Sequence, residues 1–338
     1  MPAAFGLLRT CPCQSNLHLV IGKDVMANSK PFVAIIVAVP FLGTLLAIAL
    51  LWQRAIYWPD VALMLCMYTL TGLGLTVGYH RMLTHRSFRA HPAVRFSLLA
   101  LGSMALIAPP VEFAATHLKH HAHSDRDGDP HSPLEGLFHS HLGWLWKDRF
   151  AEPQVYCRPL LADGIVVFVN RTFPLWVLLS LTIPFLLRGW TGFLWGGLVR
   201  IFLGQHVIFS VNSICHVFGR RDFDTNDTSH NHWLIGLLAM GEGWHNNHHA
   251  FPRSAFHGLG RWQLDLSGTV IQVLERLGLV YDVHRVPAAQ LLRYSLHAPD
   301  PLSSSLHPMS DNTARPTGLP CLLGNKEVRK EISCLHQP

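Results

Sequence analysis

Residues 61–85 read VALMLCMYTLTGLGLTVGYHRMLTH, an apolar run that leads directly into His80 and His85. The part from Val61 to Tyr79 carries no charge, and it is about as long as the roughly 20 apolar residues that cross a bilayer core. Neutral imidazole is a common ligand of divalent iron, zinc and copper. The stretch therefore predicts a membrane-spanning helix with potential metal ligands at one end.

Further histidines gather in the same way beside other apolar segments. They are His117, His120 and His121 in one cluster, His245, His248 and His249 in another, and His216 four residues after Asn212. Side chains at positions i, i+3 and i+4 project from one face of a helix, so each cluster can aim its imidazoles at one point. Three clusters and an Asn–His pair predict a site for two metal ions rather than one.

The residues around these histidines narrow the choice of metal. Structural zinc sites prefer four closed ligands, often thiolates, and no cysteine pair accompanies the histidines. Soluble di-iron bundles use Glu-x-x-His pairs, and none of the few glutamates stands in that pattern. We therefore expect iron in an all-imidazole site, whose nitrogens could also take manganese or zinc in a purified sample.

The composition places much of the chain in lipid, because 49% of the residues are hydrophobic and only 14% are charged. We expect an all-α membrane protein with about four transmembrane helices and a cytoplasmic helical cap that carries the histidine-rich di-iron site; six spans are the alternative. The predicted spans are residues 31–52, 61–79, 172–188 and 190–213. Residues 96–111, with Pro109-Pro110, are too short for a span and predict an interfacial or re-entrant helix.

Basic residues indicate how these spans are oriented. Lys and Arg flank the histidine clusters heavily, whereas the two short links between spans hold only Arg54 and Arg188. The positive-inside tendency therefore puts the clusters and both termini in the cytoplasm. The net charge of +6 comes without a basic run, which favours loops facing anionic lipid over a nucleic-acid partner.

The chain divides into three parts by composition. Residues 1–29 form an N-terminal extension that we expect to be weakly ordered, and translation could start at Met1 or Met26. Residues 30–287 form one functional domain. Residues 288–338 form a C-terminal tail in which Pro, Ser and Asn become frequent, and we expect it to be disordered.

Motifs around the histidines resemble those of a known family. They include Gly78-Tyr79-His80-Arg81, Thr84-His85-Arg86-Ser87-Phe88, Gly128-Asp129-Pro130-His131, Gly241-Glu242-Gly243-Trp244-His245-Asn246 and His249-Ala250-Phe251-Pro252. With the histidine spacing, and over about residues 31–287, they are similar to the membrane-bound fatty acid desaturases of the stearoyl-CoA, delta-9 type. The resemblance is specific because it involves every histidine cluster.

The resemblance implies an activity and a set of ligands. In that family nine motif histidines bind two iron ions, and a motif asparagine approaches one of them through water. These roles fall on His80, His85, His117, His120, His121, His216, His245, His248 and His249, and on Asn212. The implied reaction uses O2 and two electrons to insert a cis double bond, at delta-9, into a saturated fatty acyl chain.

Two features of the sequence bear on the acyl carrier and the electron donor. The animal acyl-CoA enzymes of this family have an aromatic-basic-acidic run directly before the cluster that corresponds to His117, His120 and His121. At that place this chain has Phe113-Ala114-Ala115-Thr116. The acyl carrier can therefore be CoA, acyl carrier protein or a glycerolipid. Because no haem-binding His-Pro-Gly-Gly motif occurs, we expect a separate electron donor: ferredoxin, rubredoxin, or cytochrome b5 with its reductase.

Residues near the clusters suggest how a substrate is held and how ligands are oriented. Tyr68, Gly72, Thr76 and His80 follow one another at steps of four along one helix face. Tyr68 and Gly72 therefore predict the floor of an acyl tunnel, with Phe113 as a third candidate and ordinary helix packing as the alternative. Carboxylates that hydrogen-bond to the outer nitrogen of a ligand imidazole orient the ring. We predict this role for Asp125, Asp129 and Glu242, although Asp129 also suits a turn. We expect His131 and His257 to be structural or interfacial, with a role as partners of the ligand histidines as the alternative. We expect His206 to serve either helix packing or the site.

Two other functions compete with desaturation. A membrane di-iron hydroxylase or alkane monooxygenase shares three-cluster histidine patterns, but the cluster spacing and the Asn212–His216 pair favour the desaturase. A metal transporter would place its ligands near the membrane midplane, whereas here almost all lie at the ends of spans or outside them.

Overall fold

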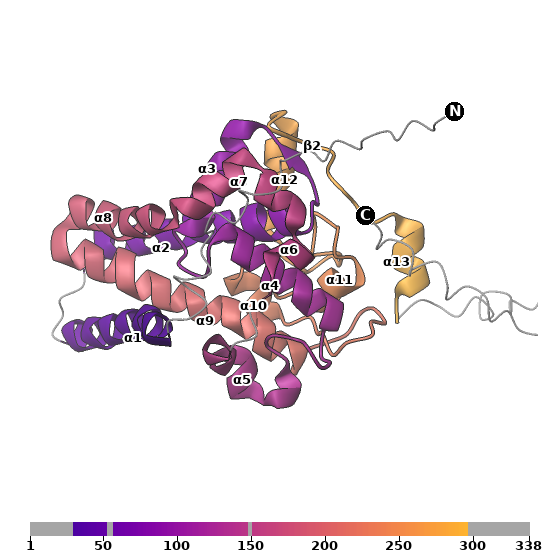
Figure 1. Cartoon of the computed structure of the whole chain (residues 1–338), viewed down its shortest axis with the longest axis horizontal. Helices are drawn as coiled ribbons and strands as arrows, with labels where there is room; N and C mark the ends of the chain where they lie inside the picture. Colours follow the sequence, from indigo (N-terminus) through magenta and orange to yellow (C-terminus); the bar gives the residue numbers. More distant parts are fainter. Residues whose placement is uncertain (1–29, 53–56, 148–150, 297–338) are drawn as a thin grey trace, which may run out of the picture. The chain divides into compact units, whose positions relative to one another are not determined.

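The computed structural model describes residues 30–52, 57–147 and 151–296, and within these ranges the chain is mostly helical (Figure 1). The predicted N-terminal extension and residues 297–338 of the predicted tail lie outside the described residues. Residues 288–294, which we assigned to the tail, form helix α13 (Ala288–Tyr294). The helical part therefore continues beyond the boundary that we predicted at residue 287.

Long helices form one side of the described chain. They are α1 (Lys30–Trp52), α2 (Trp58–Leu73) with its continuation η1 (Gly74–Thr84), α8 (Phe173–Gly192) with η5 (Phe193–Val199), and α9 (Arg200–Ser213) with η6 (Ile214–His216). Three helical runs are long and apolar enough to cross a membrane: Val33–Leu50, Trp58–Thr84 and Phe173–His216. The second run starts before and ends after the span that we predicted at 61–79.

The third run is a hairpin of two helices rather than one long helix. Its chain reverses at Gly189, whose φ of 62° and ψ of −144° are not helical; glycine adopts a positive φ without the steric cost that a side chain brings. On the two arms, Arg200 donates from Nη2 to the carbonyl of Ser180 at 3.2 Å. The arms correspond to the two segments that we predicted at 172–188 and 190–213.

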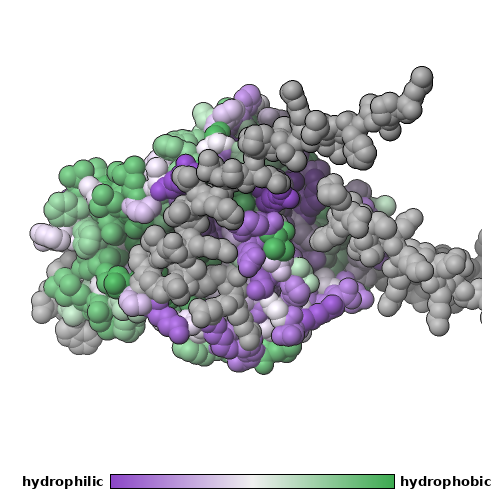
Figure 2. Space-filling model, in the orientation of Figure 1, coloured by the Kyte–Doolittle hydropathy of each residue, from purple (hydrophilic) through white to green (hydrophobic). Residues whose placement is uncertain are grey.

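The outer faces of the long helices are apolar. Leu42 on α1 is 59% exposed and Leu186 on α8 is 75% exposed. Figure 2 shows apolar side chains gathered over the side formed by α1, α2 and α8, and most of the visible hydrophilic side chains lie away from that side. Such a continuous apolar surface indicates contact with lipid.

The remaining elements form the cap. They are α3 (Pro92–Ser103), α4 (Pro110–His123), η2 (Pro133–Glu135), α5 (Leu137–His141), η3 (Gly143–Trp146), α6 (Pro153–Tyr156), η4 (Arg158–Ala162), α7 (Gly164–Arg171), α10 (Trp233–Leu238), α11 (His245–Ala250) and α12 (Leu266–Arg276). Two short strands, β1 (Arg89–Ala90) and β2 (Val280–Tyr281), pair antiparallel. The segment that we predicted as one helix over 96–111 is interrupted, because α3 ends at Ser103 and α4 begins at Pro110.

Element η1 is a π-helix, and it sets the position of the first histidine pair. The amide of His85 donates to the carbonyl of His80 at 3.1 Å, an i→i+5 bond. In such a helix residues five apart lie roughly above one another, and π-helical turns are frequent at functional sites. The spacing of His80 and His85 therefore puts both rings on one side, where an α-helix would have separated them.

Helix α3 packs closely along η1 because glycines line the contact. A Cβ atom on Gly74 would lie 2.2 Å from the backbone nitrogen of Gly102, a distance that forces one helix to move. The close contact holds η1 firmly against the cap, with all its residues buried.

We expect Gly74→Ala to lower the free energy of unfolding by roughly 1–3 kcal/mol, the usual cost of overpacking a core. The control is Gly204→Ala on α9, where an added Cβ meets nothing within 4 Å. Thermal unfolding of the purified protein in detergent checks both variants. Equal melting temperatures for the two variants would contradict the close packing of α3 on η1.

Candidate metal centre

The structure brings the nine predicted histidines together in two groups. The five-histidine group consists of His80, His85, His117, His121 and His248, and the four-histidine group consists of His120, His216, His245 and His249. Within each group, one nitrogen of every ring lies within 4.8 Å of the others. Each group can therefore hold one metal ion.

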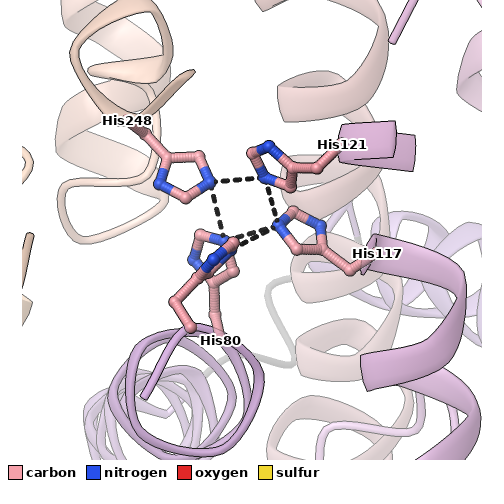
Figure 3. Close-up of side chains that lie close together, drawn as sticks. His80, His117, His121 and His248 are labelled. Carbon is pink, nitrogen blue, oxygen red and sulfur yellow. Dashed lines mark hydrogen bonds between the residues drawn. The ribbon is translucent and has the colours of Figure 1, made fainter. Parts of the chain in front are cut away.

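In the five-histidine group the ring nitrogens point toward a common centre, as Figure 3 shows for four of its members. The Nε2 atoms of His117 and His121 lie 2.9 Å apart, and that of His121 lies 2.9 Å from Nε2 of His248. The Nε2 of His80 is 2.9 Å from that of His117 and 3.2 Å from that of His248. The rings converge from η1, α4 and α11.

The four-histidine group has the same arrangement. The Nε2 of His245 lies 3.0 Å from that of His216 and 3.1 Å from that of His249. The Nε2 of His120 is buried and has no hydrogen-bond partner among the described residues. Its ring lies beside those of His216 and His249, with centroids 4.9 and 5.2 Å away.

Helices α4 and α11 each contribute to both groups, and the division follows helical geometry. On α4, His117 and His121 join the five-histidine group, while His120 joins the other. On α11 the pattern is reversed: His245 and His249 join the four-histidine group, and His248 joins the first. Residues i and i+4 lie almost above one another and i+3 lies to the side, so each helix supplies two adjacent sites.

Carboxylates fix the orientation of four of these rings. The three aspartates each accept a hydrogen bond from an Nδ1 atom, which leaves the lone pair of that imidazole on Nε2 at the centre. An oxygen of Glu242 lies as close to Nδ1 of a fourth ring. The pairs are Asp129 with His120 (3.0 Å), Asp125 with His216 (3.0 Å), Asp227 with His249 (2.7 Å) and Glu242 with His80 (2.5 Å). The structure thus brings the predicted Asp125, Asp129 and Glu242 against the rings, and it adds Asp227.

Burial keeps the imidazoles neutral. It lowers the pKa of His117, His121 and His248 well below the usual value, and the neighbouring rings lower it further. The same causes lower the pKa of His120 and His245. Neutral rings offer lone pairs rather than protons, as metal coordination requires.

The arrangement fits metal ions on physical grounds. Where Nδ1 donates to a carboxylate, as in His249, Nε2 carries a lone pair. This nitrogen lies 3.1 Å from Nε2 of His245, and in the five-histidine group the Nε2 atoms of His80 and His248 are 3.2 Å apart. A cation placed among these nitrogens is attracted to the lone pairs that neutral rings offer. Nitrogen donors of this type suit iron, as well as zinc and copper.

The other predicted residues lie at varying distances from the two groups. Asn212 is half-buried on α9, four residues before His216. The ring of Phe113 stacks on that of His117, with centroids 6.0 Å apart. Tyr68 and Gly72 line a narrow apolar cavity of about 30 Å³ together with Thr76 and Met240, and Phe113 is not among its lining residues.

Sequence reasoning missed several residues of the site. Arg81 is fully buried, and its Nη2 lies 3.0 Å from Glu242 and 2.9 Å from Asp265. His257, for which support of the ligands was the alternative to a structural role, has Nδ1 at 3.2 Å from Glu242 and its ring against His248. Asp227 precedes His249 by 22 residues, a separation with no helical regularity, and only its place in a polar run near the third cluster could have indicated it.

His131 and His206 differ in their relation to the site. The ring of His131 lies 4.3 Å from that of His120 by centroids, so it packs directly behind the four-histidine group. His206 lies away from both groups and shares a hydrogen bond of 2.9 Å with His141.

Comparisons with known proteins agree with this geometry. The sequence model described as "Fatty acid desaturase" matches residues 52–274, a region that includes all nine histidines. Over 275 residues the chain is 39% identical to the hex-5-enoyl-[acyl-carrier protein] acetylenase of Moorena producens, covering 75% of this chain and 85% of that one. It is 40% identical over 230 residues to the sn-1 stearoyl-lipid 9-desaturase of Anabaena variabilis, covering 67% and 84%. It is 37% identical over 253 residues to the acyl-CoA C20 Delta5-desaturase of Anemone leveillei, covering 73% and 81%.

Replacing Asp227 should weaken metal binding at the four-histidine group. We expect Asp227→Asn to lower metal affinity by about 10- to 100-fold, the usual effect of removing a carboxylate behind a histidine ligand. Iron content of the purified protein, measured by mass spectrometry after dialysis against a weak chelator, checks this. The matched control is Asp282→Asn, whose carboxylate is 63% exposed. Equal iron in both variants would show that Asp227 does not support a ligand.

Proposed function

Because the chain belongs to the fatty acid desaturase family, we propose that it inserts a cis double bond at the delta-9 position of a saturated fatty acyl chain. The reaction consumes O2 and two electrons. The observation that supports this proposal is the pair of adjacent imidazole groups, which share α4 and α11 and can hold two metal ions side by side. As a member of this family the protein is an oxidoreductase of lipid metabolism.

In this proposal the nine histidines hold two iron ions, with Asn212 near the ion of the four-histidine group. The bound iron pair supplies the oxidising power that is needed to remove hydrogen from unactivated methylenes. The protein keeps nitrogen lone pairs aimed at the ions through Asp125, Asp129, Asp227 and Glu242. Burial of the rings keeps water away from the centre.

The acyl chain lies in the apolar cavity beside α2. Thr76, one turn before His80, lines this cavity, and Tyr68 lies two turns further from the histidines. The hydroxyl of Tyr68 donates to the carbonyl of Leu238 at 2.8 Å, and a Cβ on Gly72 would lie 2.6 Å from Cε of Met240. Tyr68 and Met240 therefore form the end wall, and Gly72 makes room for Met240. In the described structure the cavity is narrow, so the side chain of Met240 has to move aside for a long acyl chain.

We further propose four membrane spans with the cap and both termini in the cytoplasm. The basic residues around the histidine groups support this orientation. At the other end of the spans, Arg188 is paired with Asp60 at 3.1 Å, so its charge is locally compensated. Electrons come from a separate ferredoxin, rubredoxin or cytochrome b5.

The double-bond position and the acyl carrier are the finer parts of the proposal. The similar proteins carry names that specify an acyl carrier protein, a lipid and CoA, and the named positions differ. We propose acyl-CoA or acyl-lipid as the substrate of this chain. Supplying each carrier separately to the purified enzyme distinguishes the two.

Expression in a host that lacks unsaturated fatty acids tests the reaction itself. We expect a monounsaturated acid whose double bond, located by mass spectrometry, lies between carbons 9 and 10. His248→Ala, which removes one member of the five-histidine group, should give none. A hydroxylated acid in place of the olefin would instead assign the protein to the membrane hydroxylases.

Substitutions at the end wall should change chain-length preference. We expect Gly72→Leu to favour shorter acyl chains and Met240→Ala to favour longer ones, because one methylene in an apolar pocket is worth about 1–3 kcal/mol. Competition between saturated substrates of different length, read by mass spectrometry, measures both shifts. Cys66→Leu, on the exposed side of the same helix, serves as the control. Unchanged preference in both end-wall variants would remove Tyr68, Gly72 and Met240 from the substrate site.

A further inference from the structure

The short helix α10 exposes large apolar side chains although it lies in the cap, shortly before the cluster of His245, His248 and His249. Trp233 is 68% exposed and Leu237 is 56% exposed, while Ile235 and Gly236 on the opposite face are buried. Residues 228–241 contain no Asp, Glu, Lys or Arg. A helix that is apolar on its outer face as well as its inner face does not fit an aqueous surface.

Contacts with α2 show how far α10 extends along the spans. As a reference point, Ser267 on the cap helix α12 lies level with Thr76, because their hydroxyls are 2.7 Å apart. Met240 reaches Gly72, one turn further from the cap. The carbonyl of Leu238 accepts from Tyr68 at 2.8 Å, another turn further.

The depth of this contact can be estimated from helix geometry. Twelve residues separate Tyr68 from His80, roughly 18 Å at about 1.5 Å per residue, or slightly less where the helix is π-helical. Helical side chains lean toward the N-terminus, so the hydroxyl of Tyr68 lies no nearer to the cap than its own backbone. The end of α10 is therefore deep beside the middle of the run Trp58–Thr84.

Both ends of the α10 segment return to the cap. The amide of His232 donates to the carbonyl of Gly243 at 2.8 Å, and Glu242 contacts His80. Between these points the chain descends along α9, where Ile235 and Ala239 pack with Val211 in one buried cluster. Figure 1 shows α10 beside α9. The chain then turns at Met240 and Gly241, both with positive φ.

We propose that α10 is a re-entrant helix immersed in the lipid leaflet next to the cap. Trp233 lies at the level of the headgroups, as tryptophan does at membrane interfaces, and Leu237 and Leu238 lie among the acyl chains. The exposed face of α10 thus continues the lipid-facing surface of the spans. The amides of Gly236, Ala239 and Gly241 donate to carbonyls within the segment, and the carbonyl of Leu238 accepts from Tyr68. Such internal pairing is what immersion in lipid requires of a backbone.

This inference assigns a role to the membrane in the acyl site and rests on the membrane arrangement proposed above. Leu238, Ala239 and Met240 form one wall of the cavity beside Tyr68 and Gly72. With α10 in the leaflet, this wall separates the acyl cavity from the surrounding lipid. Lipid packing against Leu237 then supports the wall from outside.

Fluorescence quenching on the full chain in phosphatidylcholine nanodiscs tests the placement. A bimane label is attached at Leu237→Cys and, separately, at Leu234→Cys, with Cys66 and the four cysteines outside the described residues replaced by serine. The buried Cys157 and Cys215 are retained. Doxyl groups on the lipid acyl chains quench labels in the leaflet, and iodide quenches labels in water.

Two matched leucines serve as references. Leu292→Cys on α13 (62% exposed) reports the cap surface, because α13 lies by α11 through the contact of Tyr294 with Phe251. Leu186→Cys on α8 (75% exposed) reports the membrane. Iron content after labelling shows that each variant is folded.

We expect doxyl lipids to quench the label at Leu237 several-fold more than the label at Leu292, with the reverse order for iodide. The label at Leu234 should follow that at Leu237. One outcome would overturn the placement of α10 but leave the membrane arrangement intact. In that outcome iodide quenches the labels at Leu237 and Leu234 as strongly as the label at Leu292, while doxyl lipids still quench the label at Leu186. Iodide quenching at Leu186 as well would overturn the proposed membrane arrangement and this inference with it.

Discussion

The structure depends on holding imidazole nitrogens from distant parts of the chain close together. Within each histidine group, Nε2 atoms from distant parts of the chain lie 2.9–3.2 Å apart. Rings from several elements have to be oriented for their nitrogens to meet in this way. Carboxylates orient four of them: Asp125, Asp129 and Asp227 each accept a hydrogen bond from Nδ1, and Glu242 lies 2.5 Å from Nδ1 of His80. A further layer, Arg81 with Asp265, fixes the position of Glu242 in turn.

Helix geometry distributes the ligands between two centres. The spacing i, i+3, i+4 occurs on both α4 and α11, and in each helix the middle histidine belongs to the group that the outer two do not join. The two helices thus share both centres. The π-helical turns of η1 add His80 and His85 from one side, and η6 adds His216 at the end of α9. Neither group can form without elements from both the spans and the cap.

Several of these features could be predicted from the sequence. The histidine spacings indicated which residues converge, because packing alone gives no reason for repeated i, i+3, i+4 histidine patterns beside apolar runs. The motif neighbours Asp125, Asp129 and Glu242 were also identified, since they are close in sequence to the histidines.

The division of the nine histidines into groups of five and four was not predictable, because it depends on how α4 and α11 cross. Asp227 and Met240 were missed since their partners, His249 and Gly72, are far away in sequence and no periodicity connects them. The π-helix was missed as well, because backbone hydrogen bonding at i→i+5 leaves no compositional signal.

The same elements that carry the candidate metal ligands also line the proposed acyl cavity, and in that proposal they fix the position of the acyl chain relative to the metal centre. Thr76 and His80 are one turn apart on the α2–η1 run, so a methylene held beside Thr76 has a fixed distance from the five-histidine group. Gly204 and Val207 line the cavity from α9, the helix that leads to His216. Since η1 and α9 are both anchored in the apolar part of the molecule, a change in their tilt would move cavity and ligands together. The glycine contact between η1 and α3 opposes such a change, because a helix whose backbone lies against its neighbour cannot move toward it. Close backbone packing in the cap thus keeps this cavity at a fixed position relative to both histidine groups.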